Sequence, residues 1–293
     1  MRLSILIPTY NQDCRQLVYD LIHKCNMPAD CEIIVGDDGS NDEETKRGNR
    51  KLQSIQRVTY WESPENLGRA RIRNRLAQMV KGEYLLFIDS DAIVETEDFI
   101  QRYLSCLPTS GVICGGIHHP DNCPSPQVSL RWRYEKACEP LFTAEQRNKN
   151  PYQGMRTFNI LFNRQVVLQH PFDEDIRQYG YEDTLMGGEL KHAGVPVLHI
   201  DNPLTNGDIE ENDVFLRKTE DSLRTLYEIQ DSMSGQSRLI QYINKLQRHR
   251  LTSIVLFAYR QTKGAIRHNL LGSTPSVRLF QFYKLGYYLE LKY

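Results

Sequence analysis

Two carboxylates, one residue apart, follow an apolar run near residue 90. Tyr84–Ile88 contains only apolar and aromatic residues, and Asp89-Ser90-Asp91 comes directly after it. An apolar run of this length is typical of a buried strand. Carboxylates at the end of such a strand need water, a cation or a ligand as partner, and open α/β sheets bind ligands just beyond their carboxyl ends. We therefore predict that Asp89 and Asp91 hold a divalent cation and the phosphates of a nucleotide.

The elements that position these carboxylates alternate between strand and helix. Strands are predicted at residues 3–8, 32–38, 57–61 and 84–88, and helices at 12–24, after a cap at Asn41 or Asp42, and at 66–80. This alternation favours a parallel, doubly wound sheet. Right-handed crossovers would bring the strand ends to one edge. The pair Asp37-Asp38 is then expected beside Asp89 and Asp91.

The second half of the chain also alternates, but its motifs leave more alternatives open. Strands are predicted at 112–117, 156–162 and 195–199, and helices at 129–138 and from Gly180 through 190. Cys114, His118, His119 and Cys123 could form a zinc cluster, but their spacing fits no standard finger. A histidine pair in an acceptor-binding loop is the favoured interpretation. Trp132 fits either a sugar-stacking platform or a core residue.

The C-terminal region is strongly basic. Residues 236–293 hold ten Lys and Arg and one acid, Glu290, and are therefore +9, whereas the rest of the chain, with 26 basic and 36 acidic residues, is −10. Apolar residues recur at helical spacing, as in Val277, Phe280, Tyr283 and Tyr287. Such a region could lie on an anionic membrane. It could instead pack against the acidic body or form a dimer contact.

Composition excludes several classes of protein. The 293 residues are 40% hydrophobic and 25% charged, which is typical of a soluble globular protein. No apolar stretch approaches the length of a membrane-spanning helix. Met1 runs directly into the strand at Leu3, so no signal peptide is expected. The seven cysteines form no disulfide framework. We expect a cytoplasmic protein with reduced thiols, possible contact with the inner face of the membrane, and no nucleic-acid partner.

Several blocks of the sequence resemble the family 2 glycosyltransferases of the GT-A fold. The blocks are Ile7–Asn11, Val35–Ser40, Asn66–Gly68 with Ala70 and Arg73-Asn74, Gly82–Tyr84 leading to Asp89-Ser90-Asp91, and then Thr157–Asn159, Phe172–Glu174 and Gly180–Asp183. The first four occur in the family's order within 90 residues. The resemblance implies a Rossmann-like, mixed but mostly parallel sheet flanked by helices. A helical C-terminal appendage would follow.

The resemblance assigns a nucleotide-sugar donor to the first half. Asp38 is similar in position to the residue that accepts from the nucleobase imide; this favours uracil, although thymine and guanine offer comparable donors. The surrounding contacts would come from Pro8, Thr9, Tyr10, Gly68, Arg73, Asp89 and Ser90. Asp91 is implied as the better ligand for Mn²⁺ or Mg²⁺, with Asp89 nearer the ribose or as a second ligand. The alternatives are structural: Asp38 could cap a helix or turn, Asp89 and Asp91 could be surface acids, and Arg73 could be an ordinary solvated helix arginine.

The resemblance places catalysis at the acid pair Glu182-Asp183. An inverting transfer needs a carboxylate that removes the proton of the acceptor hydroxyl. We assign Asp183 as this base and Glu182 to the acceptor or to orientation, with helix capping as the alternative. His199 resembles a histidine that completes the metal site in some relatives. A structural histidine is the alternative.

These observations predict an inverting, metal-dependent hexosyl- or N-acetylhexosaminyl-transferase. Its acceptor would be a glycan or a lipid-linked glycan in polysaccharide biosynthesis. The predicted domains are residues 1–205, divided into a nucleotide-binding half (1–95) and an acceptor-binding half (96–205), and a basic helical region, 206–293. A non-catalytic sugar-nucleotide-binding scaffold is the first alternative. A nucleotidyltransferase is the second, although it would need a Gly-rich basic loop after the first strand.

Overall fold

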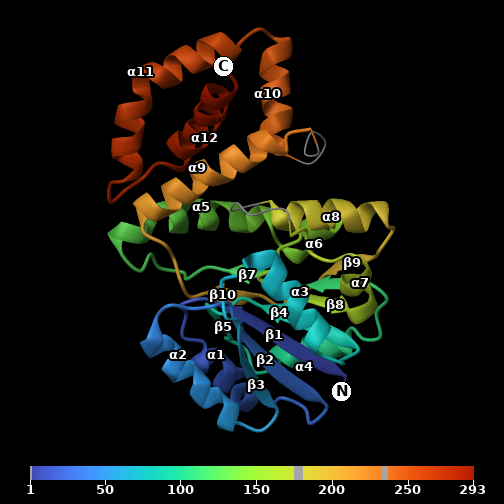
Figure 1. The fold of residues 1–293 in the computed structure, drawn as a ribbon. Helices are drawn as coiled ribbons and strands as arrows, with labels where there is room; N and C mark the ends of the chain where they lie inside the picture. Colours follow the sequence, from blue (N-terminus) through green and yellow to red (C-terminus); the bar gives the residue numbers. More distant parts are fainter. Residues whose placement is uncertain (1, 175–180, 232–236) are drawn as a thin grey trace. The chain divides into compact units, whose positions relative to one another are not determined.

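The computed structural model describes residues 2–174, 181–231 and 237–293 (Figure 1). Gly180 and Gln236, which bound predicted segments, lie outside these ranges. The chain divides into two compact units. The sheet unit comprises Met1–His118, Leu141–Arg177 and Glu182–Asp208, and the helical unit comprises His119–Pro140, Gln178–Tyr181 and Ile209–Tyr293. The helical unit therefore includes a segment, 119–140, that precedes much of the sheet unit in sequence.

The sheet unit is built on a seven-stranded sheet in the order β3-β2-β1-β4-β8-β6-β9. The first four strands along this order are parallel, β8 is antiparallel to both neighbours, and β9 is parallel to β6. The strands are β1 (Leu3–Thr9), β2 (Cys31–Asp37), β3 (Val58–Glu62), β4 (Tyr84–Ile88), β6 (Val112–Cys114), β8 (Asn159–Asn163) and β9 (Val197–His199). This arrangement confirms the predicted mixed, mostly parallel sheet.

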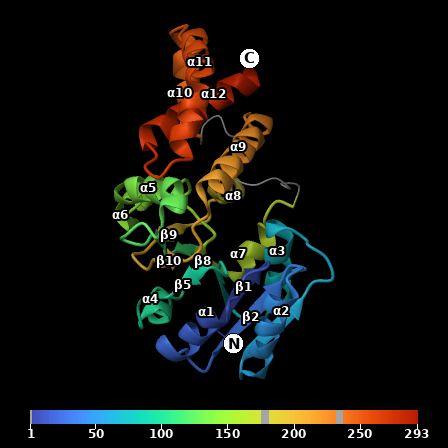
Figure 2. The ribbon, with the colours of Figure 1, turned by 90° about the vertical axis from the view of Figure 1, so that its left-hand side faces the viewer.

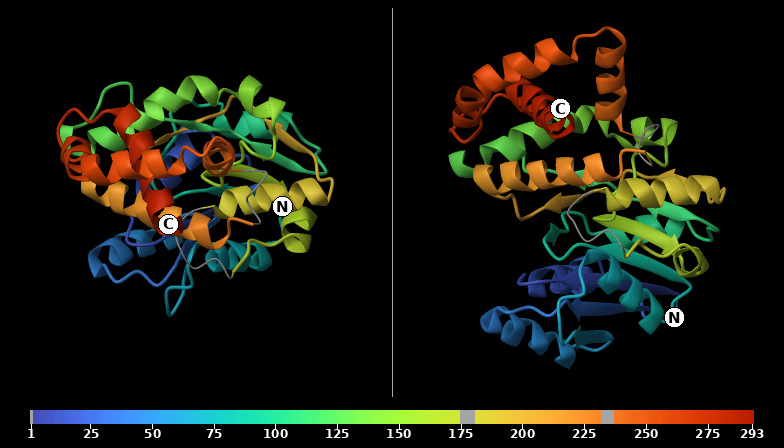
Figure 3. Two further views of the ribbon diagram at one scale, coloured as in Figure 1. Left: turned by 90° about the horizontal axis from the view of Figure 1, so that it is seen from above. Right: turned by 45° about the horizontal axis from the view of Figure 1, so that its top comes forward.

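Both faces of the sheet are buried, which explains the unbroken apolar runs. In β4, Tyr84, Leu86 and Ile88 join one core, whereas Leu85 and Phe87 join the other. Successive strand residues point to opposite faces, so a strand covered on both sides needs apolar residues at every position. Figure 3 shows the strands of this unit side by side with helices around them.

The helices of the sheet unit are α1 (Arg15–Tyr19), which continues as a π-helical turn (Asp20–Lys24), α2 (Glu43–Arg50) with a 3-10 turn (Lys51–Ser54), α3 (Arg69–Met79), α4 (Phe99–Ser105), α6 (Ala144–Lys149), α7 (Arg164–Gln169) and α8 (Glu182–His192). Asp42 caps α2 by accepting from the amides of Glu44 and Thr45, as predicted. Helix α3 begins at Arg69, three residues later than predicted, because the preceding residues form a loop that binds Asp38.

A small three-stranded sheet follows the Asp89-Ser90-Asp91 segment. It has the order β5-β10-β7, with β5 (Ala92–Ile93), β10 (Leu204–Asn206) and β7 (Ile117–His118). The amide of Gly207 donates to the carbonyl of Asp91 at 2.9 Å. This bond ties the strand-end carboxylates to a segment more than 100 residues away in sequence.

The helical unit contains α5 (Ser129–Cys138), α9 (Asn212–Glu228), α10 (Arg238–Arg248), α11 (Thr252–Leu270) and α12 (Val277–Lys292), with 3-10 turns at Pro126–Val128 and Glu139–Leu141 (Figure 2). Phe280, Tyr283 and Tyr287 of α12 are buried, as their helical spacing predicted. Tyr283 donates to Glu220 at 2.7 Å, and Arg267 pairs with the same carboxylate. Within the described residues, no helix has the length and apolar character needed to cross a bilayer.

Candidate functional site

The carboxyl ends of β1, β2 and β4 meet at one edge of the sheet. Thr9 ends β1 opposite Asp37, which ends β2, and the amide of Asp38 donates to the carbonyl of Thr9 at 2.8 Å. β4 runs parallel to β1 and leads into Asp89 at the same edge. Parallel strands joined by crossovers produce this convergence. The predicted nucleotide-binding residues of the three strands therefore share one edge.

Asp38 is buried beneath the loop that precedes α3. Its Oδ1 accepts from the amide of Leu67 at 2.7 Å and its Oδ2 from the amide of Gly68 at 3.0 Å. Burial raises the pKa of Asp38, while the two amide bonds oppose this rise. Gly68 has φ +86, which an L-residue adopts only with strain. Asp38 and Gly68, predicted separately, thus form one structural element, and each carboxylate oxygen retains acceptor capacity for a ligand donor.

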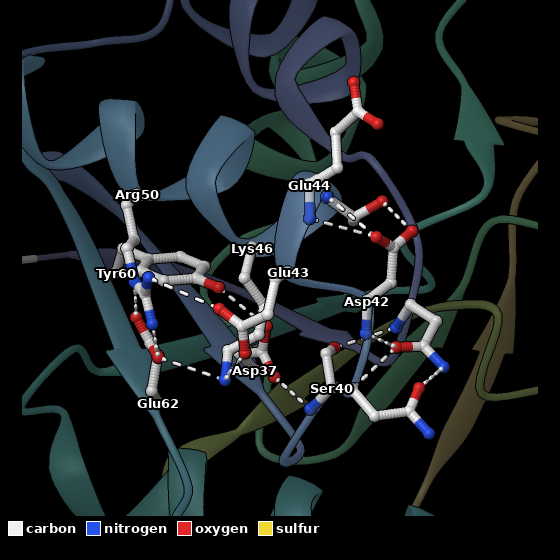
Figure 4. A network of polar contacts seen from close by, with 12 residues as sticks. Asp37, Ser40, Asp42, Glu43, Glu44, Lys46, Arg50, Tyr60 and Glu62 are labelled. Carbon is white, nitrogen blue, oxygen red and sulfur yellow. Dashed lines mark hydrogen bonds and ion pairs between the residues drawn. The ribbon is translucent and has the colours of Figure 1, made fainter.

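Asp37 belongs to a separate polar network, drawn in Figure 4. Its Oδ1 accepts from the amide of Ser40 at 2.7 Å, and its Oδ2 accepts from the hydroxyl of Tyr60 at 2.6 Å. Burial, followed by the hydrogen bond to Asp37, raises the pKa of Tyr60. Because both oxygens are engaged and the side chain is fully buried, Asp37 stabilises the turn after β2. Its neighbour Asp38 lies nearer the loop that leads to α3.

The other predicted nucleotide-binding residues differ in exposure. Thr9 is buried and donates to the carbonyl of Gln12 at 3.0 Å. Tyr10 is 46% exposed, whereas Pro8 and Ser90 are half-buried. Among these four, Tyr10 therefore offers the most side-chain surface to a ligand.

Arg73 forms an ion pair with Asp89. Its Nη2 lies 2.6 Å from Oδ1 of Asp89, and its Nη1 donates to the carbonyl of Arg69 at 3.2 Å. The Arg73 side chain is 4% exposed and its guanidinium lies 5.8 Å from the ring centre of Phe172. The sequence predicted Arg73 as a nucleotide-binding residue. In the structure its charge is directed to Asp89, so the two side chains position each other.

Asp183 lies in the first turn of α8 and accepts from the hydroxyl of Thr157 at 2.8 Å. Burial raises the pKa of Asp183, and the charges of Glu182 and Asp89 raise it further. The Thr157 hydroxyl and the charge of Arg73 act in the opposite direction. The charges of Glu182, Arg73 and Asp89 therefore all act on Asp183, and these four residues form one electrostatic cluster.

Glu182 connects this cluster to the start of α3. Its Oε1 lies 3.8 Å from Nη1 of Arg69. Its Oε2 is buried and finds no hydrogen-bond partner within the described ranges. A buried carboxylate oxygen without a partner is costly. Glu182 thus has an acceptor atom available to a ligand hydroxyl.

Both ring nitrogens of His199, the predicted third metal ligand, have partners within the protein. Its Nδ1 lies 3.0 Å from Nη1 of Arg147, and its Nε2 lies 2.8 Å from the carbonyl of Pro151. Burial lowers the pKa of His199 to about 4. The neutral ring therefore donates through Nε2 and accepts through Nδ1, which leaves no lone pair for a cation. His199 is not carried into the proposed metal site.

The alternative zinc residues also have other partners. His119 is buried, with Nδ1 3.1 Å from Glu139 and Nε2 3.6 Å from Glu135. Cys123 contacts the carbonyl of Ser125 at 3.1 Å. Trp132, the candidate stacking platform, donates to the carbonyl of Pro120 at 2.7 Å and is half-buried.

The strand-end acids suit a hard divalent cation by the chemistry of their oxygens. Within residues 2–174, 181–231 and 237–293, no three His, Cys, Asp or Glu side chains form a metal-binding group. Magnesium at nucleotide sites takes only one or two protein carboxylates, while phosphates and water supply the other ligands. Asp91 and Asp89 therefore fit a cation that arrives with a diphosphate.

Sequence reasoning missed the residues that hold the cluster together. Thr157 lay in a recognised block, but its bond to Asp183 joins residues 26 apart. No role was predicted for Arg69. The signal that could have indicated Thr157 is its position just before β8. That strand is antiparallel to β4 and begins opposite Ile88, next to the strand-end acids.

Comparisons with known proteins agree with this fold. The validoxylamine A glucosyltransferase of Streptomyces hygroscopicus subsp. limoneus is 27% identical over 225 residues, which are 67% of this chain and 49% of that protein. The poly(ribitol-phosphate) beta-glucosyltransferase of Bacillus spizizenii is 35% identical over 112 residues, 35% of this chain and 17% of that protein. The matches thus span less than half the length of these two curated relatives.

Solved structures show the same fold at low sequence identity. A mannosyltransferase from Pyrobaculum calidifontis, in complex with GDP-Man and Mn²⁺, has a TM-score of 0.62 and 16% identity, covering 99% of this chain and 85% of that chain. TarS (residues 1–349) from S. aureus has a TM-score of 0.53 and 17% identity, covering 100% and 92%. The family model described as Glycosyl transferase family 2 matches residues 4–170. With more than half of its length matched by this model, the chain belongs to glycosyl transferase family 2.

Proposed function

We propose that the protein transfers a sugar from a nucleoside-diphosphate donor to an acceptor hydroxyl, with inversion at the sugar carbon. The observation that carries this proposal is the arrangement of Asp183, which accepts from Thr157 at 2.8 Å and whose pKa is raised by burial, together with the Arg73–Asp89 ion pair at 2.6 Å. A base is most effective when its pKa approaches the working pH. Asp89 and Asp91, at the end of a strand, would stabilise the leaving group, whereas Asp183, at a helix N-terminus, would remove the proton.

Asp183 acts as the base in this scheme. It accepts the proton of the acceptor hydroxyl while that oxygen attacks the sugar carbon opposite the departing diphosphate. Thr157 fixes one carboxylate oxygen and leaves the other for the acceptor. Glu182 binds a second acceptor hydroxyl through its unpartnered Oε2.

Asp91, with Asp89 beside it, would hold Mn²⁺ or Mg²⁺, and Arg73 keeps the Asp89 carboxylate oriented. The cation would neutralise the charge that develops on the leaving diphosphate. Relatives of the same fold support divalent metal use, since the Pyrobaculum enzyme was solved with Mn²⁺.

The donor base would lie in the 1–95 half, near Asp38, Gly68 and the exposed Tyr10, with Pro8, Thr9 and Ser90 as flanking contacts. UDP is the favoured nucleotide because a carboxylate accepts from the uracil imide. GDP remains the alternative, because guanine also offers ring donors and the Pyrobaculum enzyme was solved with GDP-Man.

We assign a glycan or lipid-linked glycan as acceptor, bound by the 96–205 half. Related enzymes named for poly(ribitol-phosphate) transfer support a polymeric acceptor in polysaccharide biosynthesis. All seven cysteines are free thiols, which supports a reducing compartment such as the cytoplasm. The basic C-terminal region, from residue 206, is assigned to a membrane with anionic lipids.

The test is a thermal-shift panel of nucleotide sugars, each with and without Mn²⁺, followed by a transfer assay with the donor that binds. We expect one donor to raise the unfolding temperature only when Mn²⁺ is present, and product to form with an acceptor glycan. Donor binding without any transfer to any acceptor would favour the scaffold alternative. Binding that is equal after chelation would remove the metal role.

The Thr157→Val substitution tests whether the Thr157 hydroxyl lowers the pKa of Asp183. The hydroxyl lowers the pKa of Asp183, so its loss should raise that pKa further. Because the base acts deprotonated, we expect the acidic limb of the kcat profile to move to higher pH. Thr157→Ser, which keeps the hydroxyl, should restore the original limb. A profile that is the same in all three proteins would contradict this role.

A further inference from the structure

Some cations of the C-terminal helices are paired with acids, and others are not. Lys263 and Arg260 contact Glu290, at 2.6 and 3.8 Å, and Arg267 pairs with Glu220 at 2.7 Å. Lys245, Arg248 and Arg250, by contrast, are exposed and form no ion pair within the described parts of the chain. Arg238, Arg278 and Lys292 also form no ion pair within the described residues, but they are far apart in sequence, whereas Lys245, Arg248 and Arg250 lie within six consecutive residues where α10 ends and α11 begins.

The aromatic residues that suggested a membrane contact from sequence are not available for one. Phe280, Tyr283 and Tyr287 are buried in the helical unit. Their rings pack on one another and on neighbouring helices, as in the pair Phe215–Phe280 with centres 5.5 Å apart. Helix α12 therefore forms the core of its unit.

A different set of apolar side chains is exposed, beside the unpaired cations. Leu251 is 42% exposed, Ile254 65% and Phe257 66%. Positions three apart lie on one face of a helix, so Leu251, Ile254 and Phe257 form a continuous stripe at the start of α11. Arg248 is the last residue of α10, and Arg250 lies in the turn directly before this stripe. Figure 1 shows α10 and α11 joined by this turn. We call Arg248, Arg250, Leu251, Ile254 and Phe257 the α10–α11 corner.

We propose that the α10–α11 corner is a docking surface for a membrane that contains anionic lipids. Leu251, Ile254 and Phe257 would enter the headgroup region, while Arg248, Arg250 and Lys245 would contact lipid phosphates. Apolar insertion and electrostatic attraction together give stable but reversible binding, which neither provides alone. The inference deepens the proposed function and rests on it, because a lipid-linked acceptor would be found at such a surface.

A second copy of the chain fits this corner less well. A two-fold dimer brings the same patch of both copies together. The positive charges of both copies would then meet in one interface, and Glu290, the sole acid of residues 237–293, already contacts Lys263 and Arg260. An anionic surface complements the charge of the corner, whereas self-association opposes it.

The test is co-sedimentation of the full chain with vesicles of phosphatidylcholine alone and with vesicles that also contain phosphatidylglycerol. We expect binding only to the anionic vesicles, and weaker binding at high salt. Phe257→Asp should lower the partition coefficient about tenfold or more. Leu271→Asp is the matched control, because Leu271 is 40% exposed directly after the other end of α11 and the charge change is identical; it should bind nearly as the parent does.

A second variant separates charge from insertion. Arg248→Gln with Arg250→Gln should weaken binding to the anionic vesicles and leave the folded state unchanged, because both side chains are exposed. Failure of the parent to bind anionic vesicles, or equal losses in Phe257→Asp and Leu271→Asp, would overturn the proposal. So would a dimer of the parent that Phe257→Asp converts to a monomer.

Transfer to a water-soluble acceptor, measured on the same preparations, keeps the two proposals apart. Transfer without vesicle binding rejects the docking surface alone. Vesicle binding without transfer rejects the proposed function and leaves the surface assigned.

Discussion

Replacing Asp183 with asparagine is expected to lower kcat about a thousandfold, within the range attributed to general base catalysis. Asparagine keeps an acceptor oxygen for Thr157, whose hydroxyl lies 2.8 Å from the present carboxylate, but it cannot take a proton from the acceptor. Donor binding should persist, because Asp183 contacts the acceptor in the proposed scheme. The measurements are single-turnover transfer and donor titration by calorimetry.

The same substitution should not weaken the fold at neutral pH. Burial raises the pKa of Asp183 in the folded state, so folding favours its protonated form. The stability associated with that form is present below the unfolded pKa and is lost as pH rises through the folded pKa. A neutral asparagine avoids this loss at neutral pH.

The matched control is Glu189→Gln on the same helix. Glu189 is 59% exposed and pairs with His170 at 3.0 Å, outside the cluster. Its loss should change kcat by less than about twofold, as is usual for exposed pairs. Equal turnover in Asp183→Asn and the parent would remove Asp183 as base.

The architecture of the site could be predicted because it follows from strand ends. Apolar runs stop at Thr9, Asp37 and Asp89, and parallel topology places such ends at one edge whatever the side chains are. The sequence blocks then supplied the family and its fold. This reasoning uses no side-chain contacts. It therefore located the sheet edge that holds the predicted nucleotide-binding residues, but not the hydrogen bonds and ion pairs among their side chains.

The pairings depend on contacts between distant segments, which no local pattern encodes. Asp38 looked like an open ligand residue, yet its oxygens hold the loop at Leu67 and Gly68. His199 looked like an available imidazole, yet Arg147 and Pro151 take both of its nitrogens. Likewise, segment 119–140 packs in the helical unit, because its helix α5 finds its partners in α9 and α12.

Arg73→Met should have the largest effect on stability, and it should also impair donor binding. Arg73 is 4% exposed and pairs with Asp89, whose side chain is 28% exposed, at 2.6 Å. Removing one partner of a buried pair leaves the other carboxylate without its counter-charge, which typically costs about 3–5 kcal/mol. Because water reaches part of Asp89, we expect a loss of about 2 kcal/mol in the free energy of unfolding. Donor affinity should fall as well, because Asp89 loses its orientation.

Urea unfolding, followed by tryptophan fluorescence, measures this loss of stability in the sheet unit, which contains Arg73. The two tryptophans divide between the units, with Trp61 in the sheet unit and Trp132 in the helical unit. In a Trp132→Phe background the signal therefore reports on the unit that contains Arg73.

Arg71→Met is the matched control, since Arg71 lies on the same helix but is 45% exposed and pairs with Glu174 at 3.4 Å. Its loss should stay within about 0.5 kcal/mol, as for other surface positions. If the two variants unfold at the same urea concentration, the Arg73–Asp89 pair does not stabilise the site; if Arg73→Met is destabilised but binds donor normally, the pair supports the fold without orienting Asp89.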